Sequence, residues 1–589
     1  MNKNRNKIRT RLYPFSQIIK VSLSLVLFIS ISISSYAKDS APLLNFNERI
    51  FPTIATKGMV ASQESRATKV GVKILDQGGN AVDAAVAVGF ALAVTLPRAG
   101  NVGGGGFMMI YNKENSRVEA LDYREKAPKK AYRDMFLDSD FSVDNKKARY
   151  SVLSAGVPGT VAGLFEAHRK YGKLPIEKLI QPAIELANEL PMTFAMAESL
   201  NRKKKYMSRS KASIDTYYKK DRTPWNIKDT IYQKDLASVL MAVKETKGRS
   251  FYQGSTAKKI VDYIQSEGGL MTLDDMASYK PVWRTPLKAQ FGEASIYSMP
   301  PPSSGGIHLV QLLNIMQNFP LHKSGVNSLF STHMTTEAMK FAYADRSKYL
   351  GDPDFVSVPV EKLMSPEYAN RIASKISENK VLKSSEVLPG MYISKESPQT
   401  THYSVIDKDG NIVSNTYTLN FSFGSGITVP GTGILLNNEM DDFSAKPGSP
   451  NGYGLLGGDA NAIEPEKRPL SSMTPVVVLK NGEPWLATGS PGGSRIITIV
   501  YNFLINKMVH DMNIASATIT PRIHHQWYPE VLMLEKGFPL DTARLLEGKG
   551  HKIKFYNPWG SLQSVELDNG VFFGFSDTRR PGALAEGLN

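Results

Sequence analysis

The stretch 81–96 constrains the fold most, because it is rich in alanine and apolar on nearly every side. Asn80 can cap its first turn, and Pro97 follows its end. A helix without a polar face is buried between other layers of a protein. The interrupting Asp83 and the short length argue against a membrane span. The sequence therefore predicts a layered fold with this helix inside it.

Neighbouring segments fit a layered arrangement. Residues 64–77 have helical spacing and stop at two glycines, a signal for the end of a helix. Four glycines at 103–106 open a predicted strand at 107–111. They match neither a dinucleotide-binding nor a P-loop pattern, so we expect close backbone packing there. After residue 400 strands dominate, with helices predicted near 495–508 and 540–548.

The first 37 residues have the order of zones typical of a secretory signal peptide. Residues 1–20 contain six basic residues and no acidic residue. An apolar stretch follows at 21–33, and small residues stand at positions 35 and 37. We expect export and cleavage after Ala37. A permanent anchor helix is the alternative, but the stretch is short for a span and contains serines.

Composition narrows the classes of function. Without the six basic residues of the leader, 65 Lys and Arg stand against 55 Asp and Glu, a net charge of +10 over 552 residues. The basic residues are spread out, with one run at 202–205 that is typical of a solvated helix face, so we expect no nucleic-acid partner. The chain has no cysteine, which excludes thiol catalysis, disulfides and cysteine-ligated metals.

The segment 400–419 reads as a β-hairpin whose register decides which side chains meet. Two strand-like runs flank a turn signal at 407–411. A two-residue turn would place Thr400 opposite Leu419. A three-residue loop with Gly410 left-handed would place Thr400 opposite Thr418, with Cβ atoms roughly 4.5–5.5 Å apart. We predict the second register, which sets a hydroxyl beside Thr400, although both threonines could be ordinary strand residues.

A glycine-rich turn at 489–494 lies between a predicted strand at 483–488 and the helix that follows. Bare backbone amides at a positive helix end favour an anion. Aimed at a tetrahedral intermediate, they would form an oxyanion hole. A phosphate cradle is the rival interpretation, but no lysine stands at the P-loop spacing. A tight turn without a binding role is the third interpretation.

Three further groups could contribute polar chemistry. Segment 435–443 brings carboxylates together, which could act as acid and base, bind a metal, receive an ammonium group or stay solvated. Two hydroxyls precede a strand at Ser471-Ser472. Arg124 could clamp a carboxylate or pair with a neighbour. His524-His525 is not a convincing metal pair, because adjacent strand residues point to opposite faces. Serine-hydrolase, metalloprotease and NTPase motifs are missing, and we expect no cofactor and no metal.

These motifs stand in the same order as in bacterial γ-glutamyltranspeptidases, which the chain resembles from about residue 45 to residue 589. The resemblance is most specific at 399–407, 417–420, 437–446, 468–475 and 489–495. That family belongs to the N-terminal nucleophile hydrolases. The resemblance implies an α+β fold, a four-layer αββα sandwich with two stacked, mainly antiparallel sheets between helical layers.

The resemblance also implies a role for each matching residue. Thr400 is expected as nucleophile and Thr418 as its hydroxyl partner, with the oxyanion hole at Gly492 and Gly493. The donor's α-carboxylate is expected at Arg124, Ser471 and Ser472. Its α-ammonium is expected at Asn420, Glu439 and Asp442. Some bacterial relatives have glutamine where Glu439 stands, which alters charge more than role. Tyr453 is expected as the gate of a lid loop.

The reaction implied by the resemblance begins with self-cleavage between Gln399 and Thr400. Residues 38–399 become a large subunit and 400–589 a small one, which build one core and stay together as a heterodimer. A free α-amino group ordinarily has a pKa of about 7.7–8.0, so the amine released on Thr400 is suited to act as base. The γ-glutamyl group of glutathione or another γ-glutamyl compound then passes, through an ester on Thr400, to water or to an amino acid or peptide amine.

Two alternatives stay open on the sequence alone. One is a related acylase that acts on β-lactam side chains, and the other is a secreted binding protein that has lost catalysis. The family favours the periplasm as the place of an exported chain, and we expect no membrane span in the mature protein.

Overall fold

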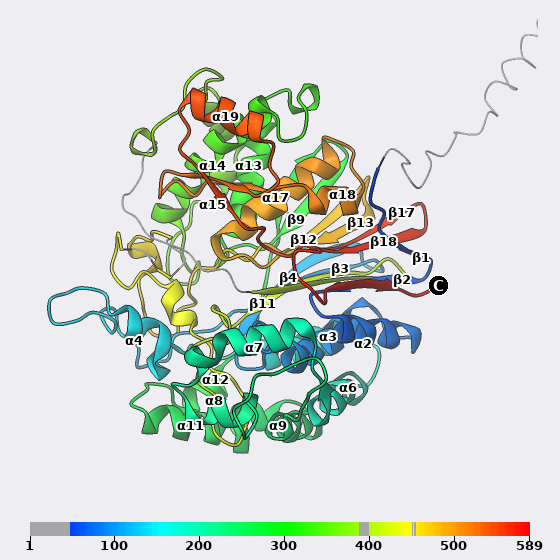
Figure 1. The fold of residues 1–589 in the computed structure, drawn as a ribbon, viewed down its shortest axis with the longest axis vertical. Helices are drawn as coiled ribbons and strands as arrows, with labels where there is room; N and C mark the ends of the chain where they lie inside the picture. Colours follow the sequence, from blue (N-terminus) through cyan, green and yellow to red (C-terminus); the bar gives the residue numbers. More distant parts are fainter. Residues whose placement is uncertain (1–47, 388–399, 450, 453–454) are drawn as a thin grey trace, which may run out of the picture. The chain divides into compact units, whose positions relative to one another are not determined.

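Two seven-stranded antiparallel sheets lie face to face at the centre of residues 50–589 (Figure 1). The computed structural model describes residues 48–387, 400–449, 451–452 and 455–589. The predicted signal peptide, Gln399 and Tyr453 lie outside these described residues. Within them, no helix combines the length and the apolar character needed to cross a membrane.

Both sheets mix strands from before and after residue 400. The first sheet has the order β1 (Thr53–Ala55), β18 (Val571–Ser576), β17 (Gln563–Asp568), β13 (Glu483–Thr488), β12 (Val476–Lys480), β9 (Ala294–Ser298), β8 (Leu287–Phe291). The second has the order β19 (Leu584–Gly587), β2 (Gly58–Ser62), β10 (Thr401–Asp407), β11 (Ile412–Thr418), β3 (Gly105–Asn112), β4 (Arg117–Tyr123), β7 (Val282–Arg284). The hairpin that starts after Thr400 is therefore an inner part of its sheet.

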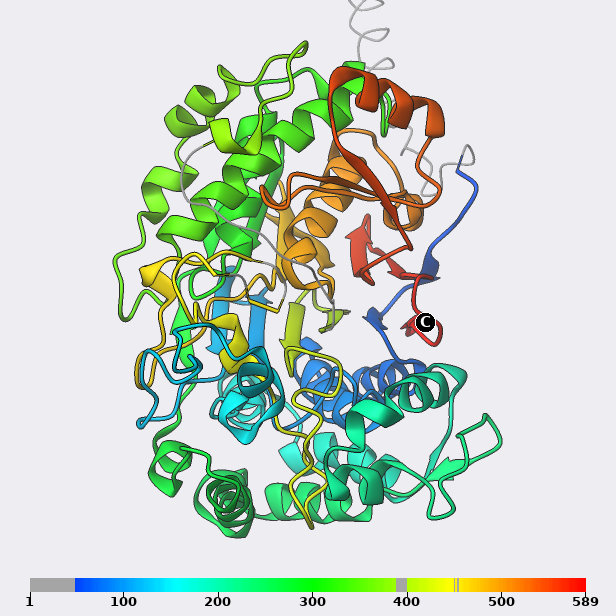
Figure 2. The ribbon, with the colours of Figure 1, turned by 60° about the vertical axis from the view of Figure 1, so that its left-hand side comes forward.

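Helices cover the outer face of each sheet, so the order of layers is αββα (Figure 1), and Figure 2 shows the same layers from another side. The layer on the second sheet contains α2 (Ser65–Asp76), α3 (Ala81–Thr95), α5 (Thr160–Tyr171), α6 (Ile176–Asn188), α7 (Phe194–Met207), α8 (Lys211–Tyr217), α9 (Lys234–Glu245), α10 (Arg249–Gln253), α11 (Ser255–Ser266) and α12 (Leu273–Ser278). The layer on the first sheet contains α13 (Gly305–Met316), α14 (Leu329–Tyr349), α15 (Val360–Met364), α16 (Pro366–Ala373), α17 (Ile496–Met508), α18 (Ile514–Ile519) and α19 (Leu540–Lys549).

Smaller elements complete the described chain. Helix α4 (Asn145–Tyr150) lies near the lower layer in Figure 1. A two-stranded sheet pairs β5 (Leu190–Pro191) with β6 (Thr230–Ile231). A three-stranded sheet has the order β14 (Ile523–His524), β15 (Leu532–Glu535), β16 (Ile553–Tyr556). The predicted αββα fold class is confirmed by this arrangement.

Helix α3 is buried along all of its length, as its apolar sequence predicts. Asn80 accepts a hydrogen bond from the Asp83 amide, and the Asp83 side chain accepts one from the Asn80 amide, which forms a capping box. The Asp407 carboxylate accepts a hydrogen bond from the Ala81 amide at 2.8 Å. Because Asp407 ends β10, this contact ties the start of α3 to the hairpin that begins after Thr400.

The glycine run packs backbone against backbone, as expected. A Cβ atom added at Gly104 would lie 1.9 Å from the Thr418 carbonyl oxygen, and one at Gly106 would lie 2.4 Å from the Thr416 carbonyl oxygen. Side chains at these positions would push β3 away from β11. Glycines at the start of β3 therefore let the end of β11, which carries Thr418, lie where it does.

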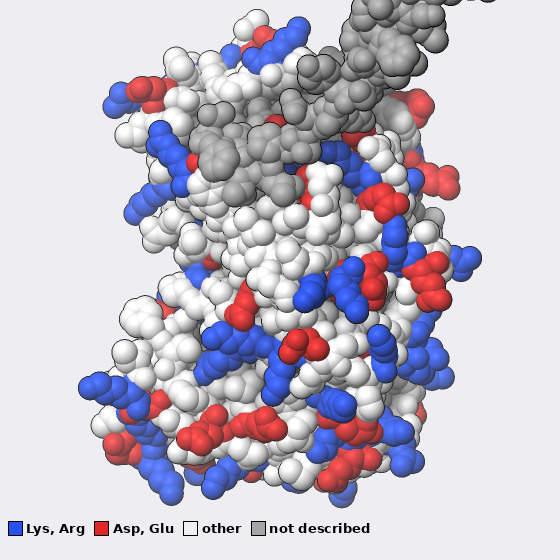
Figure 3. All heavy atoms as spheres, turned by 90° about the vertical axis from the view of Figure 1, so that its right-hand side faces the viewer, with Lys and Arg blue, Asp and Glu red and all other residues white. Residues whose placement is uncertain are grey.

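The surface carries both signs of charge. In Figure 3, Lys and Arg side chains lie next to Asp and Glu side chains over much of the described face. The basic run 202–205 lies on α7, with Arg202 and Lys205 exposed and the two residues between them partly buried. This distribution agrees with the prediction that the basic excess is spread over the molecule.

Candidate active site

Thr400 faces Thr418 across the hairpin, in the register predicted from the turn. Thr401 pairs with Tyr417, and the Asp407 amide donates to the Asn411 carbonyl at 3.1 Å. Gly410 has φ +85°, so the loop has the left-handed residue that the three-residue turn requires. The Oγ1 atoms of the two threonines are 3.4 Å apart, and both side chains are buried.

The hydroxyl of Thr418 is oriented by its own neighbour. It accepts a hydrogen bond from the Asn420 amide at 2.8 Å. Asn420 has φ +71°, and its Nδ2 atom donates to the Asn438 carbonyl at 2.9 Å. The left-handed turn after β11 thus holds the Thr418 oxygen, whose proton can be directed at Thr400.

The glycine turn comes to the same place. After β13 the chain reaches Gly492 with φ +153° and Gly493 with φ +58°, a region that favours glycine. A 3-10 turn from Gly493 to Arg495 leads into α17, which starts one residue later than predicted. Gly493 lines the same pocket as Thr400, whereas Gly492, the residue before it, is not among the lining residues. A helix start with exposed amides suits an anion.

Arg124 lies directly after β4 and is fully buried. Its guanidinium donates to the carboxylates of Glu439 and Asp442, and its Nε atom donates to the Pro469 carbonyl at 3.2 Å. A Glu125 carboxylate oxygen lies 3.6 Å from Nη1. The sequence leaves two interpretations of Arg124 open, a clamp for a carboxylate or a salt bridge to a neighbour. In the structure Arg124 forms salt bridges with carboxylates of the protein and also lines the pocket.

The short turn η4 (Glu439–Asp442) is fixed by Asn437. The Nδ2 atom of Asn437 donates to the carbonyls of Gly103 and Gly156 at 2.9 and 2.8 Å. Its Oδ1 atom accepts from the amides of Gly156 and Glu439 at 2.9 and 3.1 Å. Every polar atom of this amide therefore anchors η4 to backbone from the first part of the chain.

Asp441 points away from Arg124 and holds a different loop. Its carboxylate accepts from Arg149 Nε at 2.9 Å and from the Gly452 amide at 2.8 Å. The turn η4 thus divides its carboxylates, with Glu439 and Asp442 at Arg124 and Asp441 at Gly452. The contact holds Gly452 at this turn.

Arg346 is a site residue that sequence reasoning missed. It lies on α14, is buried, and lines the pocket together with Thr400 and Ser472. Its Nη2 atom donates to the Ser472 hydroxyl at 3.2 Å, and its Nε atom donates to the Ser304 hydroxyl at 3.0 Å. A lone arginine in a helical stretch gives little signal in the sequence, because such residues usually lie on solvated faces.

The pocket brings most of the predicted residues together. Nine of them share its wall: Arg124, Thr400, Thr418, Asn420, Glu439, Asp442, Ser471, Ser472 and Gly493. They come from the ends of β4, β10 and β11, from η4, from the loop before β12 and from the turn before α17. Arg124, from the first part of the chain, thus meets residues from Thr400 onward at one edge of the stacked sheets.

A family model described as gamma-glutamyltranspeptidase matches residues 67–587. The chain belongs to the γ-glutamyltranspeptidase family. It is 51% identical over 559 residues to a glutathione hydrolase proenzyme of Escherichia coli strain K12. The matched region covers 94% of this chain and 96% of that protein. It is 37% identical over 584 residues to a glutathione hydrolase proenzyme of Bacillus subtilis strain 168, covering 96% and 97%. The resemblance stated from the sequence is confirmed.

Solved structures show the same fold. A cephalosporin acylase from Bacillus halodurans superposes with a TM-score of 0.82 at 28% identity and covers 94% of this chain and 99% of its own. A chain of Helicobacter pylori γ-glutamyltranspeptidase has a TM-score of 0.55 at 43% identity and covers 59% of this chain and 98% of its own. The chain is therefore a γ-glutamyltranspeptidase-family enzyme with the fold of the N-terminal nucleophile hydrolases.

Burial raises the pKa of four carboxyl groups on and beside η4. It raises the pKa of Glu125 to about 7 and the pKa of Asp441 to about 6, while the arginines beside them act in the opposite direction. It also raises the pKa of Glu439 and of Asp442, against the attraction of Arg124. A positive charge brought beside these groups would favour their ionised form.

The histidine nearest to the nucleophile cannot serve as its base at neutral pH. Burial lowers the pKa of His402 to about 3. Its ring nitrogens hydrogen-bond to the hydroxyls of Thr416 and Ser404 at 2.8 and 3.0 Å. The ring also packs below Gly489, where a Cβ atom would lie 2.4 Å from it. His402 therefore supports the glycine turn that this family places near its nucleophile.

His524 is likewise held by hydrogen bonds. Its ring bonds to the Thr498 hydroxyl at 2.8 Å and to the Gln526 side chain at 3.0 Å, and burial lowers its pKa to about 3. His525 accepts a hydrogen bond from the Trp527 amide at 3.1 Å and lines a different cavity. The two adjacent rings thus lie in different surroundings, as the side chains of adjacent residues in an extended chain do.

Proposed function

We propose that this chain removes the γ-glutamyl group from glutathione and other γ-glutamyl compounds and passes it to water or to an amino acid or peptide amine. The observation that carries the proposal is the pair of hydroxyls of Thr400 and Thr418, 3.4 Å apart, in the pocket that holds Arg124 and Gly493. The names of the similar E. coli and B. subtilis proteins support glutathione as a donor.

Maturation begins with attack of the Thr400 hydroxyl oxygen on the Gln399 carbonyl carbon. The peptide nitrogen leaves as the new α-amino group of Thr400, and an ester links Gln399 to the Thr400 oxygen. Water then hydrolyses the ester and restores the hydroxyl. The products are residues 38–399 and 400–589, of 362 and 190 residues. The H. pylori chain, which covers 59% of this chain over 98% of its own length, supports a large fragment of about this size.

Donor recognition follows from the charges in the pocket. Arg124, Ser471 and Ser472 receive the α-carboxylate of the donor. Asn420, Glu439 and Asp442 receive its α-ammonium. Arg124 already forms ion pairs with Glu439 and Asp442. The α-carboxylate and the α-ammonium of the donor therefore add a second pair of opposite charges to this group of side chains. Two opposite charges fix the glutamyl group at its α-carbon and leave its γ-carbonyl over Thr400.

Turnover repeats the chemistry on the bound donor. The α-amino group of Thr400 takes the hydroxyl proton, and the oxygen attacks the γ-carbonyl. The amides of Gly492 and Gly493 stabilise the oxyanion, which is worth about 2.7–4 kcal/mol per donor in measured cases. Cysteinylglycine leaves from glutathione with the proton, and water or an amine then opens the ester. Tyr453 covers the site during these steps. No cofactor or metal takes part.

Export completes the proposal. The zones of residues 1–37 support removal of a signal peptide after Ala37 and delivery to the periplasm. Fractionation of cells tests this step, and activity retained in the cytoplasm together with an intact N-terminus would contradict it.

N-terminal sequencing of the smaller fragment tests the assignment of the nucleophile. We expect the fragment to start at Thr400, and we expect Thr400→Ala to abolish both cleavage and activity. A γ-glutamyl anilide, assayed with and without glycylglycine, separates hydrolysis from transfer. A cephalosporin carrying a glutaryl side chain is the comparison substrate, because the acylase structure is similar. A fragment that starts elsewhere, or faster release from the cephalosporin, contradicts the proposal.

A further inference from the structure

A lysine-rich cavity lies apart from the Thr400 pocket and shares no lining residue with it. Its volume open to water is about 480 Å³. Five lysines line it: Lys340, Lys380, Lys383, Lys549 and Lys552. Among its described lining residues Glu530 is the single carboxylate, and that group accepts a hydrogen bond from the Ser384 amide at 2.8 Å. The cavity therefore has a strongly positive wall.

Among the described residues, three of the lysines have no carboxylate within ion-pair distance. Lys340 is buried and pairs with Glu337 at 2.8 Å, and Lys380 lies 3.7 Å from Glu386. Within the described part of the chain, Lys383, Lys549 and Lys552 form no ion pair. Like charges that converge on one cavity repel one another, and an anion placed between them relieves that repulsion.

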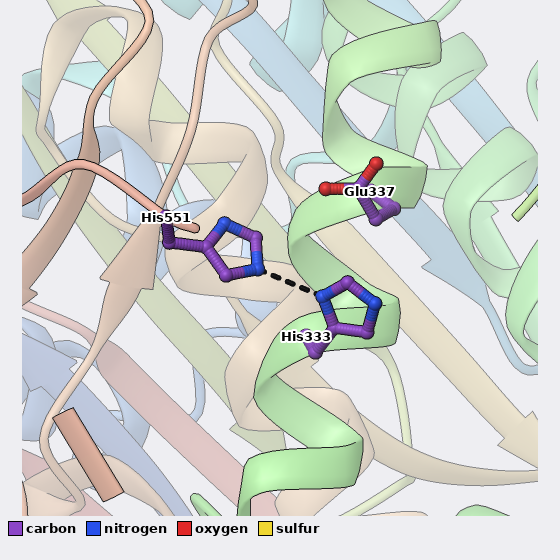
Figure 4. Close-up of side chains that lie close together, drawn as sticks. All are labelled: His333, Glu337 and His551. Carbon is purple, nitrogen blue, oxygen red and sulfur yellow. Dashed lines mark hydrogen bonds between the residues drawn. The ribbon is translucent and has the colours of Figure 1, made fainter. Parts of the chain in front are cut away.

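His551 lines the cavity, and Figure 4 shows its hydrogen bond to His333, which lies behind it on α14. His333 Nε2 lies 2.8 Å from the Ser377 carbonyl, and His333 Nδ1 lies 2.7 Å from His551 Nε2. Because a carbonyl only accepts, His333 carries its proton on Nε2 and His551 donates to it. Burial, His333 and two of the lysines lower the pKa of His551 to about 3, and burial lowers the pKa of His333 as well.

A metal ion suits this pair of histidines poorly. The ligand atoms of His333, Glu337 and His551 lie within 4.8 Å of one another, which is close enough for a shared ion. However, the Glu337 carboxylate already accepts from Lys340 Nζ at 2.8 Å and from the Leu382 amide at 3.0 Å. A cation would meet the positive charge of Lys340 and would have to break the bond between the two rings. The surroundings favour the opposite sign of charge.

We propose that this cavity binds a compact multivalent phosphate-type oxyanion. Lysines present point charges with rotating donors, which suit phosphoryl oxygens, and the wall has no arginine to select a planar carboxylate. The cavity is larger than a single water or halide ion needs, so a polyatomic anion fits it. Its lysines come from both sides of Thr400, at 340–383 and at 549–552. An anion there links the two fragments of the cleaved protein, a consequence that rests on the proposed cleavage.

Isothermal titration of the purified cleaved protein with inorganic pyrophosphate tests this site, at constant ionic strength. We expect one saturable site and a rise of the unfolding temperature by a few degrees. The variant Lys380→Gln/Lys552→Gln removes one exposed lysine from each side of Thr400. We expect it to bind pyrophosphate about tenfold more weakly or worse and to keep its activity on a γ-glutamyl anilide.

Lys228→Gln is the matched control, because it removes an exposed lysine that does not line the cavity. We expect it to bind pyrophosphate as the unchanged protein does. Glycerol phosphate, titrated in parallel, separates recognition of an organic phosphate monoester from recognition of the inorganic diphosphate. No saturable binding of either anion, or equal weakening by Lys228→Gln and by the double variant, would overturn the proposal. Neither result depends on whether the Thr400 pocket is active.

Discussion

Among single residues, Arg346 offers a sharp test of donor binding, because it lines the pocket and donates to the Ser472 hydroxyl. It donates to Ser472 and Ser304, and burial lowers its pKa to about 10. Arg346→Met should leave the Ser472 hydroxyl without this donor and remove a positive charge from the pocket. Charge-assisted hydrogen bonds of this kind contribute about 1.5–3 kcal/mol, so we expect KM for a γ-glutamyl donor to rise roughly tenfold or more, with a smaller change in kcat.

The neighbouring Lys348 gives the control for that experiment. It is exposed on the same helix, and Lys348→Gln should leave KM unchanged. A general loss of stability in Arg346→Met would lower the amount of active enzyme and thus kcat, while KM stayed the same. An unchanged KM for Arg346→Met would therefore show that Arg346 does not position the donor.

Residue by residue, the sequence predicts local geometry better than distant contacts. The position of Thr400 opposite Thr418 follows from one turn, because Gly410 sets the register for the whole hairpin. The roles of the remaining site residues came from resemblance to a family and not from physical reasoning on this chain. Arg346 escaped prediction because its partners stand 42 and 126 positions away. Nothing in a single sequence reports contacts of that separation.

Among the elements, η4 makes donor binding depend on pH. Burial raises the pKa of Glu439 and of Asp442, the two carboxyl groups that the proposal assigns to the donor's ammonium group. A donor's ammonium group binds the ionised carboxylates more strongly than the protonated ones. We therefore expect KM for a γ-glutamyl donor to fall severalfold as the pH rises from about 5 to about 8. Values of KM and kcat from initial rates at each pH separate this effect on KM from ionisation of the Thr400 α-amino group, which changes kcat.

Two other buried carboxyl groups, Asp441 on η4 and Glu125 beside it, make stability change in the opposite direction. A carboxyl group whose pKa is higher in the folded protein than in the unfolded chain stabilises the fold most below its unfolded pKa, near 4. That contribution is lost as the pH rises through the folded values near 6 and 7. Glu125→Gln cannot ionise, so the decline in unfolding temperature should become flatter, whereas Glu439→Gln should flatten the KM profile. A KM that is constant between pH 5 and 8 would contradict this account.

On the scale of the whole molecule, the layers could be predicted but the order of strands could not. The apolar helix at 81–96 requires layers on both sides, and α3 has them. Sheet order depends on pairs far apart in the chain, such as β10 with β2 and β11 with β3. These pairings join segments more than 300 residues apart, and alternation of apolar residues within each strand carries no information about the partner.

That interleaved order predicts how the cleaved protein unfolds. Strands β10 and β11 lie between β2 and β3, so the two fragments cannot separate without opening the second sheet. After the cut, unfolding releases two chains, and association then opposes unfolding by mass action. We expect the unfolding temperature of the cleaved protein to rise with protein concentration. The uncut Thr400→Ala variant unfolds as one chain, so its unfolding temperature should not depend on concentration. If both proteins behave alike, or if the small fragment elutes alone from a native column, the fragments do not form one cooperative fold.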